Sequence, residues 1–153
     1  MDQAGAPIID LAPGAEDNPF AVELARLIRD NLAANPRKLA DFRGLRCSVL
    51  MVAQDLGEAL TLRFDHGRLT IHDGTVGIPS VTFCGDLDAL RRLSDFPVTR
   101  WLRLPIVTPF AQKGRETWRY LTHLFASGDL KVYGLTVHPR TVVFLLRILS
   151  VHG

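Results

Sequence analysis

The chain has 153 residues, of which 47% are hydrophobic and 22% charged, a length and composition that suit one domain around a single core. The formal net charge of +2 is far from the concentrated positive charge of nucleic-acid-binding proteins, so we expect no nucleic acid among the partners. The N-terminus has no basic leader and no apolar run approaches the roughly 20 residues that cross a bilayer, which predicts a soluble, cytoplasmic protein.

The N-terminal part of the chain divides into an arm and a helix. Residues 1–17 mix Ala, Gly and Pro without a sustained period, so we expect a flexible or loosely docked arm followed by a single domain over residues 18–153. Asn18 offers a capping side chain and Pro19 a suitable first-turn dihedral for a helix that ends near residues 35–36. Its apolar positions recur at helical spacing: Leu24, Leu27, Ile28 and Leu32. A short helical turn is expected over residues 39–42.

The middle of the chain is predicted to be rich in strands. Residues 47–53 are apolar at both parities, which indicates a strand buried on both faces. Residues 60–65 and 68–72 alternate apolar and polar side chains around a hairpin turn at residues 66–67. A further strand covers residues 80–84, and Asp86 then caps a helix. Cys47 and Cys84 fall in these strands without zinc or redox spacing, and are interpreted as reduced core residues.

Residues 95–113 combine three prolines with apolar side chains that include Trp101 and Phe110. Loops of this length are often functional, so residues 96–110 are a candidate lid. The alternative, that most of these side chains plug the edge of the core, has more weight. Residues 115–126 are predicted to form a helix, and residues 129–133 the last strand.

The final predicted helix, residues 139–150, is more apolar than a surface helix needs to be. One stripe at helical spacing consists of Val142, Leu145, Leu146 and Leu149, and further apolar surface comes from Val143, Phe144 and Ile148. A bound lipid, a partner subunit or a membrane would cover such a surface. Because nearly every position is apolar, the pattern does not decide which face points inward.

No motif for catalysis or metal binding is present. The five histidines are scattered, no serine lies in a Gly-x-Ser-x-Gly elbow, and the glycines are separated turn residues. We therefore predict no catalytic residue, no metal, no cofactor and no enzymatic activity. Arg63, Arg68 and Lys131 fall on polar strand faces, where a solvated surface is the favoured interpretation and contact with anionic lipid headgroups the alternative.

Several short segments, in this order of elements, resemble a known family. They are Phe42-Arg43-Gly44, residues 67–71 (Gly-Arg-Leu-Thr-Ile), Asp73-Gly74, residues 81–83 (Val-Thr-Phe), residues 85–87 (Gly-Asp-Leu) and residues 128–134 (Gly-Asp-Leu-Lys-Val-Tyr-Gly). Over about residues 32–149 the chain is similar to the sterol-binding domain of the sterol carrier protein type-two family. The resemblance implies an α+β fold in which a five-stranded, mostly antiparallel sheet is covered by helices and encloses an apolar cavity. In that family the cavity holds lipids without transforming them.

The apolar strand faces and the final helix agree with such a cavity. Its predicted ligand-binding residues are Leu62, Phe64, Leu69, Ile71, Phe83, Trp101, Phe110, Val142, Leu145, Leu146 and Leu149. The predicted function is non-catalytic binding or presentation of a fatty acyl, sterol-like or isoprenoid lipid, and the resemblance implies a lipid-accessory role in ubiquinone biosynthesis as one specific form. Peripheral membrane contact and a homodimer are further candidate interactions. The alternative is a protein-interaction or dimerisation module with a filled core, docking through Phe144, Ile148 and Val151.

Overall fold

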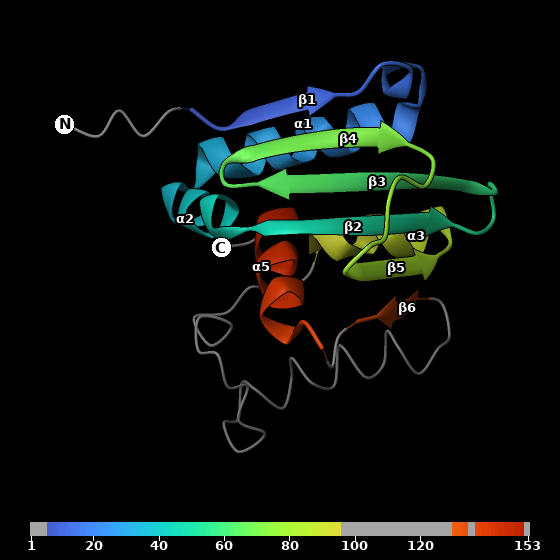
Figure 1. Cartoon of the computed structure of the whole chain (residues 1–153). Helices are drawn as coiled ribbons and strands as arrows, with labels where there is room; N and C mark the ends of the chain where they lie inside the picture. Colours follow the sequence, from blue (N-terminus) through green and yellow to red (C-terminus); the bar gives the residue numbers. More distant parts are fainter. Residues whose placement is uncertain (1–5, 96–129, 135–136, 152–153) are drawn as a thin grey trace.

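A six-stranded mixed sheet with helices against one of its faces forms the part of the chain that this computed structural model describes, residues 6–95, 130–134 and 137–151 (Figure 1). In chain order the elements are β1 (Ile8–Leu11), the 3-10 turn η1 (Ala15–Asp17), α1 (Pro19–Ala34), α2 (Pro36–Gly44), β2 (Arg46–Ala53), β3 (Glu58–Asp65), β4 (Arg68–Asp73), β5 (Val81–Gly85), α3 (Leu87–Arg91), the 3-10 turn η2 (Arg92–Asp95), β6 (Leu130–Tyr133) and α5 (Pro139–Leu149). The expected helix over residues 115–126 lies outside the described residues.

The sheet corrects the expectation of five mostly antiparallel strands. Its order is β1-β4-β3-β2-β5-β6, with parallel pairing of β1 to β4 and of β2 to β5. The β2-β3-β4 meander and the β5-β6 pair are antiparallel. The parallel pairing of β2 with β5 requires a crossover, and residues 74–80 pass over the face of the sheet that carries no helices (Figure 1).

The sixth strand, β1, comes from the segment that the sequence assigned to a flexible arm. Ile9 is buried and lies beside Leu69 in parallel register, and the Arg29 guanidinium donates a hydrogen bond to the Ile9 carbonyl at 3.0 Å. Residues 8–11 are therefore an ordered part of the sheet. That residues 18–153 form a single domain stays a prediction.

Local sequence signals start α1 and the β3-β4 hairpin where they were predicted, whereas α2 spans Pro36–Gly44 instead of the short turn expected over residues 39–42. The Asn18 side chain accepts hydrogen bonds from the backbone N–H groups of Phe20 and Ala21, and Pro19 occupies the first helical position of α1. Between β3 and β4, His66 and Gly67 have φ values of 42° and 95°. Two positive φ values are the requirement of the tight two-residue turn that matches strand twist.

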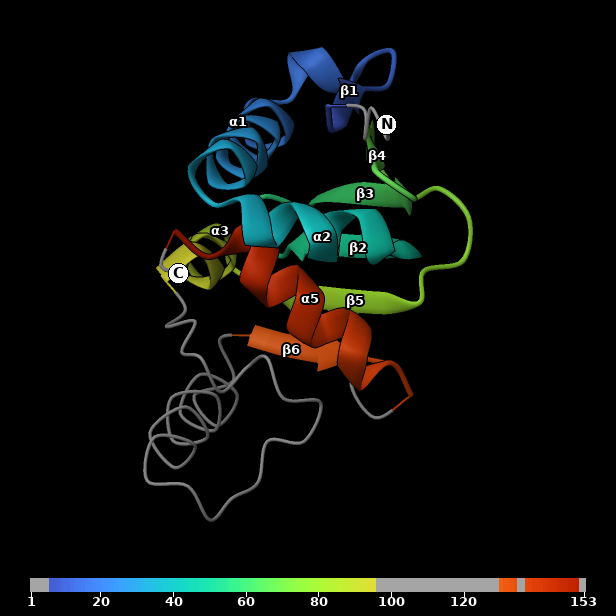
Figure 2. The same ribbon diagram turned by 90° about the vertical axis from the view of Figure 1, so that its left-hand side faces the viewer.

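The core lies between the sheet and the helices (Figure 2). Leu62, Leu69 and Ile71 are fully buried on the helix-covered face. The strand β2 was predicted to be buried on both faces, and this is wrong: Val49, Met51 and Ala53 are buried, whereas the alternate residues Ser48, Leu50 and Val52 are half-buried. In the described residues, helices cover only one face of the sheet. The crossover, residues 74–80, covers part of the other face (Figure 1).

The chain itself covers α5, which settles the orientation that the sequence left open. The buried positions of this helix are Val142, Leu145, Leu146, Ile148 and Leu149. Phe144 is half-buried, and the guanidinium groups of Arg140 and Arg147 lie over its ring, 5.3 and 5.7 Å from the centroid. Because Ile148 is inside the core, the predicted docking face of Phe144, Ile148 and Val151 does not exist as one surface.

Two polar side chains, one from α1 and one from α2, fix the last turn of α5. The Asn31 side-chain amide donates to the carbonyl oxygens of Ile148 and Leu149 at 2.9 Å each, and the Lys38 ammonium donates to the Ser150 carbonyl. Burial lowers the pKa of Lys38, and the nearby Asp41 carboxylate opposes that shift. The last carbonyls of a helix have no partner within it, so these contacts satisfy groups that would otherwise be buried unpaired.

Candidate functional site

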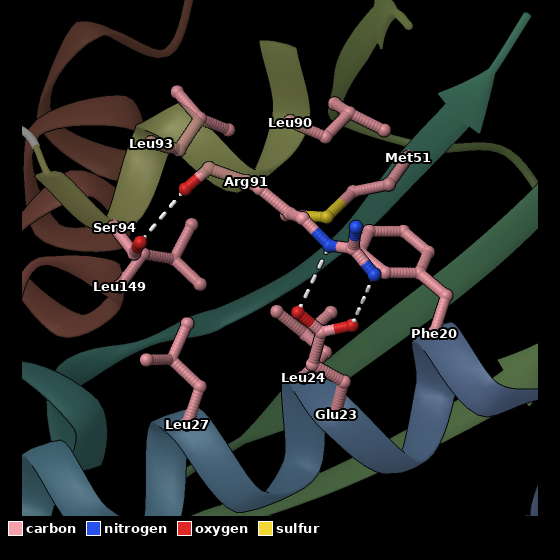
Figure 3. Close-up of a pocket in the computed structure, with 10 residues that line it drawn as sticks. All are labelled: Phe20, Glu23, Leu24, Leu27, Met51, Leu90, Arg91, Leu93, Ser94 and Leu149. Carbon is pink, nitrogen blue, oxygen red and sulfur yellow. Dashed lines mark hydrogen bonds and ion pairs between the residues drawn. The ribbon is translucent and has the colours of Figure 1, made fainter. Parts of the chain in front are cut away.

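A pocket of about 310 Å³ opens between α1, β2, the α3-η2 segment and the end of α5 (Figure 3). Its apolar wall is made by Phe20, Leu24, Leu27, Met51, Leu90, Leu93 and Leu149, and its polar residues are Glu23, Arg91 and Ser94. The volume is at the lower end of the ~300–1,000 Å³ that small-molecule sites occupy. The site therefore has the size and the lining to accept an apolar ligand, or part of a longer one.

Helical spacing on α1 provides one wall of this pocket. Phe20, Leu24 and Leu27 succeed one another at intervals of four and three residues, so their side chains share one side of the helix. Phe20 and Leu24 are buried, whereas Leu27 is half-buried. The Leu27 side chain thus lies at the border of the core, where a ligand could replace solvent against it.

Facing α1, the short helix α3 and the turn η2 provide Leu90 and Leu93. Asp86 directly precedes α3, and its carbonyl accepts the first helical hydrogen bond from the N–H of Leu90 at 3.0 Å. The Asp55 side chain adds a hydrogen bond to the Leu87 N–H at 3.0 Å. These contacts hold α3 over the end of β2, where Met51 forms the floor of the pocket (Figure 3).

An ion pair at the rim joins the two helical walls. Figure 3 shows Arg91 of α3 reaching toward Glu23 of α1, and two parallel hydrogen bonds connect them, from Nε to Oε1 at 3.0 Å and from Nη2 to Oε2 at 2.9 Å. The carboxylate raises the pKa of Arg91. Both side chains are about half exposed, so the pair adds little stability. Its fork geometry instead fixes where a charged or polar ligand head would meet the protein.

Ser94 contributes the third polar group. Its hydroxyl donates to the Arg91 carbonyl at 2.7 Å, and the Ser94 carbonyl accepts from the Val151 N–H at 2.8 Å. The polar side chains of the lining are therefore engaged with the protein itself.

The predicted site residues are brought together in the core, but few of them reach the pocket. Leu62, Phe64, Leu69, Ile71 and Phe83 pack on the covered face of the sheet, and Val142, Leu145 and Leu146 pack against them from α5. Leu149 belongs to the same cluster and also lines the pocket. Trp101 and Phe110, and with them the candidate lid, lie outside the described residues.

The other face of the sheet carries a polar groove of about 540 Å³ over β2, β3 and β4. Arg63 and Arg68 line it and are exposed, as their strand positions predicted, and Arg68 lies 3.8 Å from the Asp10 carboxylate. Thr61 differs from the expectation of an open polar face, because it is buried under the crossover. Its hydroxyl donates to the Gly74 carbonyl at 2.8 Å and accepts from the Val76 N–H at 3.0 Å.

The thiols and carboxylates of the described residues form no metal site. Within residues 6–95, 130–134 and 137–151, no group of three His, Cys, Asp or Glu side chains converges on one point. Cys47 and Cys84 are free thiols, and burial raises the pKa of Cys47 to about 11. Across the same described ranges, no helix has the length and apolarity that crossing a membrane requires.

Comparison with solved structures identifies the fold. A structure described as "UbiJ-SCP2 Ubiquinone synthesis protein" superposes with a TM-score of 0.59 and 17% sequence identity, over 88% of this chain and 95% of that one. The chain has the sterol carrier protein type-two fold. The resemblance seen in the short segments of the sequence is thereby confirmed at the level of fold, with the sheet of six strands described above.

Two further structures show a weaker likeness. The crystal structure of sterol carrier protein 2 gives a TM-score of 0.46 at 11% identity, over 83% of this chain and 91% of that one. The solution structure of a conserved hypothetical protein from Thermus thermophilus, described as possibly a sterol carrier protein, gives 0.41 at 12% identity, over 83% and 84%. No protein-family model and no curated protein sequence matches the chain.

Proposed function

We propose that this protein binds a hydrophobic lipid in the pocket between α1, β2, the α3-η2 segment and α5, and holds it without changing it chemically. The observation that carries the proposal is the composition of the pocket: seven apolar side chains form the wall, and one fork-shaped ion pair lies at the rim. The sterol carrier protein type-two fold supports a lipid as the ligand.

The apolar wall supplies the driving force for binding. Removing about 300 Å² of an acyl or isoprenoid chain from water contributes about 7 kcal/mol at ~25 cal/mol per Å². The loss of translational and rotational freedom offsets about 4 kcal/mol or more of that gain. A contact between the ligand head and the polar rim would therefore add affinity that the chain alone does not provide.

The polar rim narrows the class of ligand. Arg91 offers guanidinium donors and Glu23 carboxylate oxygens at the same place, so a lipid whose head carries both an acceptor and a donor can contact the pair without breaking it. A hydroxyl or a phenolic group satisfies this condition, whereas an ionised carboxylate only accepts hydrogen bonds and would contact Arg91 alone. In its finer form the proposal is a fatty acyl, sterol-like or isoprenoid ligand, and the ubiquinone synthesis protein among the similar structures supports the isoprenoid class.

A substitution at the border of the pocket tests this proposal. Leu27→Trp places a larger side chain at a half-buried lining position, and is expected to lower the affinity for a fluorescent fatty acid by about tenfold or more, by filling space that the ligand needs. Val22→Trp is the matched control, because Val22 lies on the same helix, is 43% exposed and does not line the pocket. Circular dichroism and thermal unfolding establish that both variants fold.

Two results would contradict the proposed site. Equal affinity of wild type and Leu27→Trp would place the ligand elsewhere. Absence of binding by the folded wild type to fatty acid, sterol and isoprenoid probes alike would remove the lipid-binding function itself.

A further inference from the structure

A second surface, distinct from the pocket, carries unusually exposed apolar side chains. Ile78 is 92% exposed, Val137 73% and Tyr133 58%, the three highest values among the large hydrophobic residues of the described chain. Single exposed apolar residues are ordinary on protein surfaces. Here, however, the three most exposed ones come from two parts of the chain that meet: Ile78 from the crossover, and Tyr133 and Val137 from the end of β6 and the residue two before α5. We call these three residues the apolar edge.

Register and packing bring the two segments together. Thr82 of β5 pairs with Tyr133 of β6, so the start of β5 lies beside the end of β6. The backbone at Gly134 approaches the Ser80 carbonyl so closely that a Cβ at this position would clash with it. Ile78 is two residues before Ser80, and Val137 is three residues after Gly134. Figure 2 shows the crossover on the side of the sheet away from α1 and α3.

The two sequence segments that carry the apolar edge contain basic but no acidic residues. Residues 74–85 and 130–153 contain no Asp or Glu, whereas they include Lys131, Arg140 and Arg147. Arg147 pairs with Asp41 of α2 at 3.1 Å, but Lys131 and Arg140 are exposed. Leu56 is another exposed large hydrophobic residue, at 51%, but its neighbours are acidic. It lies between Asp55 and Glu58 in the β2-β3 turn.

We propose that the apolar edge docks the protein onto an anionic membrane surface, with Ile78 inserting among the lipids and Lys131 and Arg140 contacting their headgroups. Peripheral membrane binding combines these two elements in modest amounts, apolar side chains that reach the acyl boundary and cations that meet anionic headgroups. The side chain of Ile78 protrudes from the crossover, and a lipid bilayer can accept a protruding apolar side chain without a complementary pocket. The proposal goes beyond the lipid pocket and does not depend on what the pocket holds.

Vesicle co-sedimentation tests the proposal on the full chain. Wild type is expected to bind vesicles of phosphatidylcholine with phosphatidylglycerol at low salt, and to bind much less at high salt or to phosphatidylcholine alone. Ile78→Glu should lower the partition onto the anionic vesicles by about tenfold or more, since it replaces the inserting side chain by a charge of the wrong sign. Lys131→Gln and Arg140→Gln should each lower it by about fivefold.

Leu56→Glu is the matched control and should leave vesicle binding unchanged, because it makes the same substitution at a similarly apolar, exposed position in an acidic setting. Both positions are exposed, so neither change is expected to affect folding. Failure of the wild type to bind anionic vesicles, equal binding of Ile78→Glu, or equal loss in Leu56→Glu would overturn the proposal. Sedimentation velocity gives one more such outcome: a dimer that Ile78→Glu dissociates would assign the apolar edge to a second copy of the chain.

Discussion

Replacing Asn31 by leucine should destabilise the protein strongly, because this one side chain of α1 satisfies the end of α5. Its amide donates two hydrogen bonds, each 2.9 Å, to the carbonyl oxygens of Ile148 and Leu149, and it is 6% exposed. A buried polar group that loses its partner costs about 1–3 kcal/mol. At about 2 kcal/mol each, the two carbonyls that lose their donor cost about 4 kcal/mol. The buried leucine side chain returns about 1 kcal/mol, so the free energy of unfolding should fall by about 3 kcal/mol.

Urea unfolding and a thermal melt measure this loss. For a domain of this length, about 3 kcal/mol corresponds to a fall of about 10 °C in Tm. Asn35→Leu is the comparison variant: its side chain accepts a hydrogen bond from the Arg37 N–H at the start of α2, and loss of such a cap costs about 1 kcal/mol. If Asn31→Leu cost no more than Asn35→Leu, the joining of α1 to α5 by this amide would be refuted.

Two further predictions concern a glycine and a thiol. Gly134→Ala should lower the free energy of unfolding by about 3 kcal/mol, since its φ is 89° and a Cβ would meet the Ser80 carbonyl, whereas Gly57→Ala, with φ 65° and open space, should cost only about 1 kcal/mol in urea unfolding. A similar loss in both variants would contradict the close approach. Because its pKa is raised to about 11, the Cys47 thiol should be about 100-fold less ionised at pH 8 than an ordinary cysteine. Iodoacetamide labelling of a Cys84→Ser variant, followed by mass spectrometry, should show slow alkylation that accelerates toward pH 11, and rapid labelling of the folded protein at pH 8 would contradict it.

Much of the fold was predictable because its signals are local. Asn18-Pro19 starts α1, and the alternation on either side of His66-Gly67 gives the β3-β4 hairpin. The extent of α5 was also predicted, but its inward face was left open, because nearly every position of the helix is apolar. The strand β1 could not be predicted in this way. It has four residues, one of them buried, and it is a strand because it pairs with β4, which lies far from it in the sequence.

The pocket was less predictable than the core. Periodicity finds the side chains that are most deeply packed, and Leu62 and Ile71, two of the predicted ligand-binding residues, are fully buried and do not line this pocket. The lining instead combines Leu27, at the edge of its helix stripe, with Met51 and Leu93 from separate elements. The spacing of apolar residues within one element does not predict where the packing of α1 against η2 leaves a pocket. The position of Leu27 at the margin of the apolar stripe of α1 was the one available signal.

Native mass spectrometry of the purified protein, followed by organic extraction and identification of the lipid, tests the lipid-binding function most directly. We expect a co-purifying acyl, sterol-like or isoprenoid species at close to one molecule per chain, and its loss in Leu27→Trp but not in Val22→Trp. A folded wild-type protein that carries no lipid, and that also takes up none when it is incubated with these lipids, would contradict the lipid-binding function.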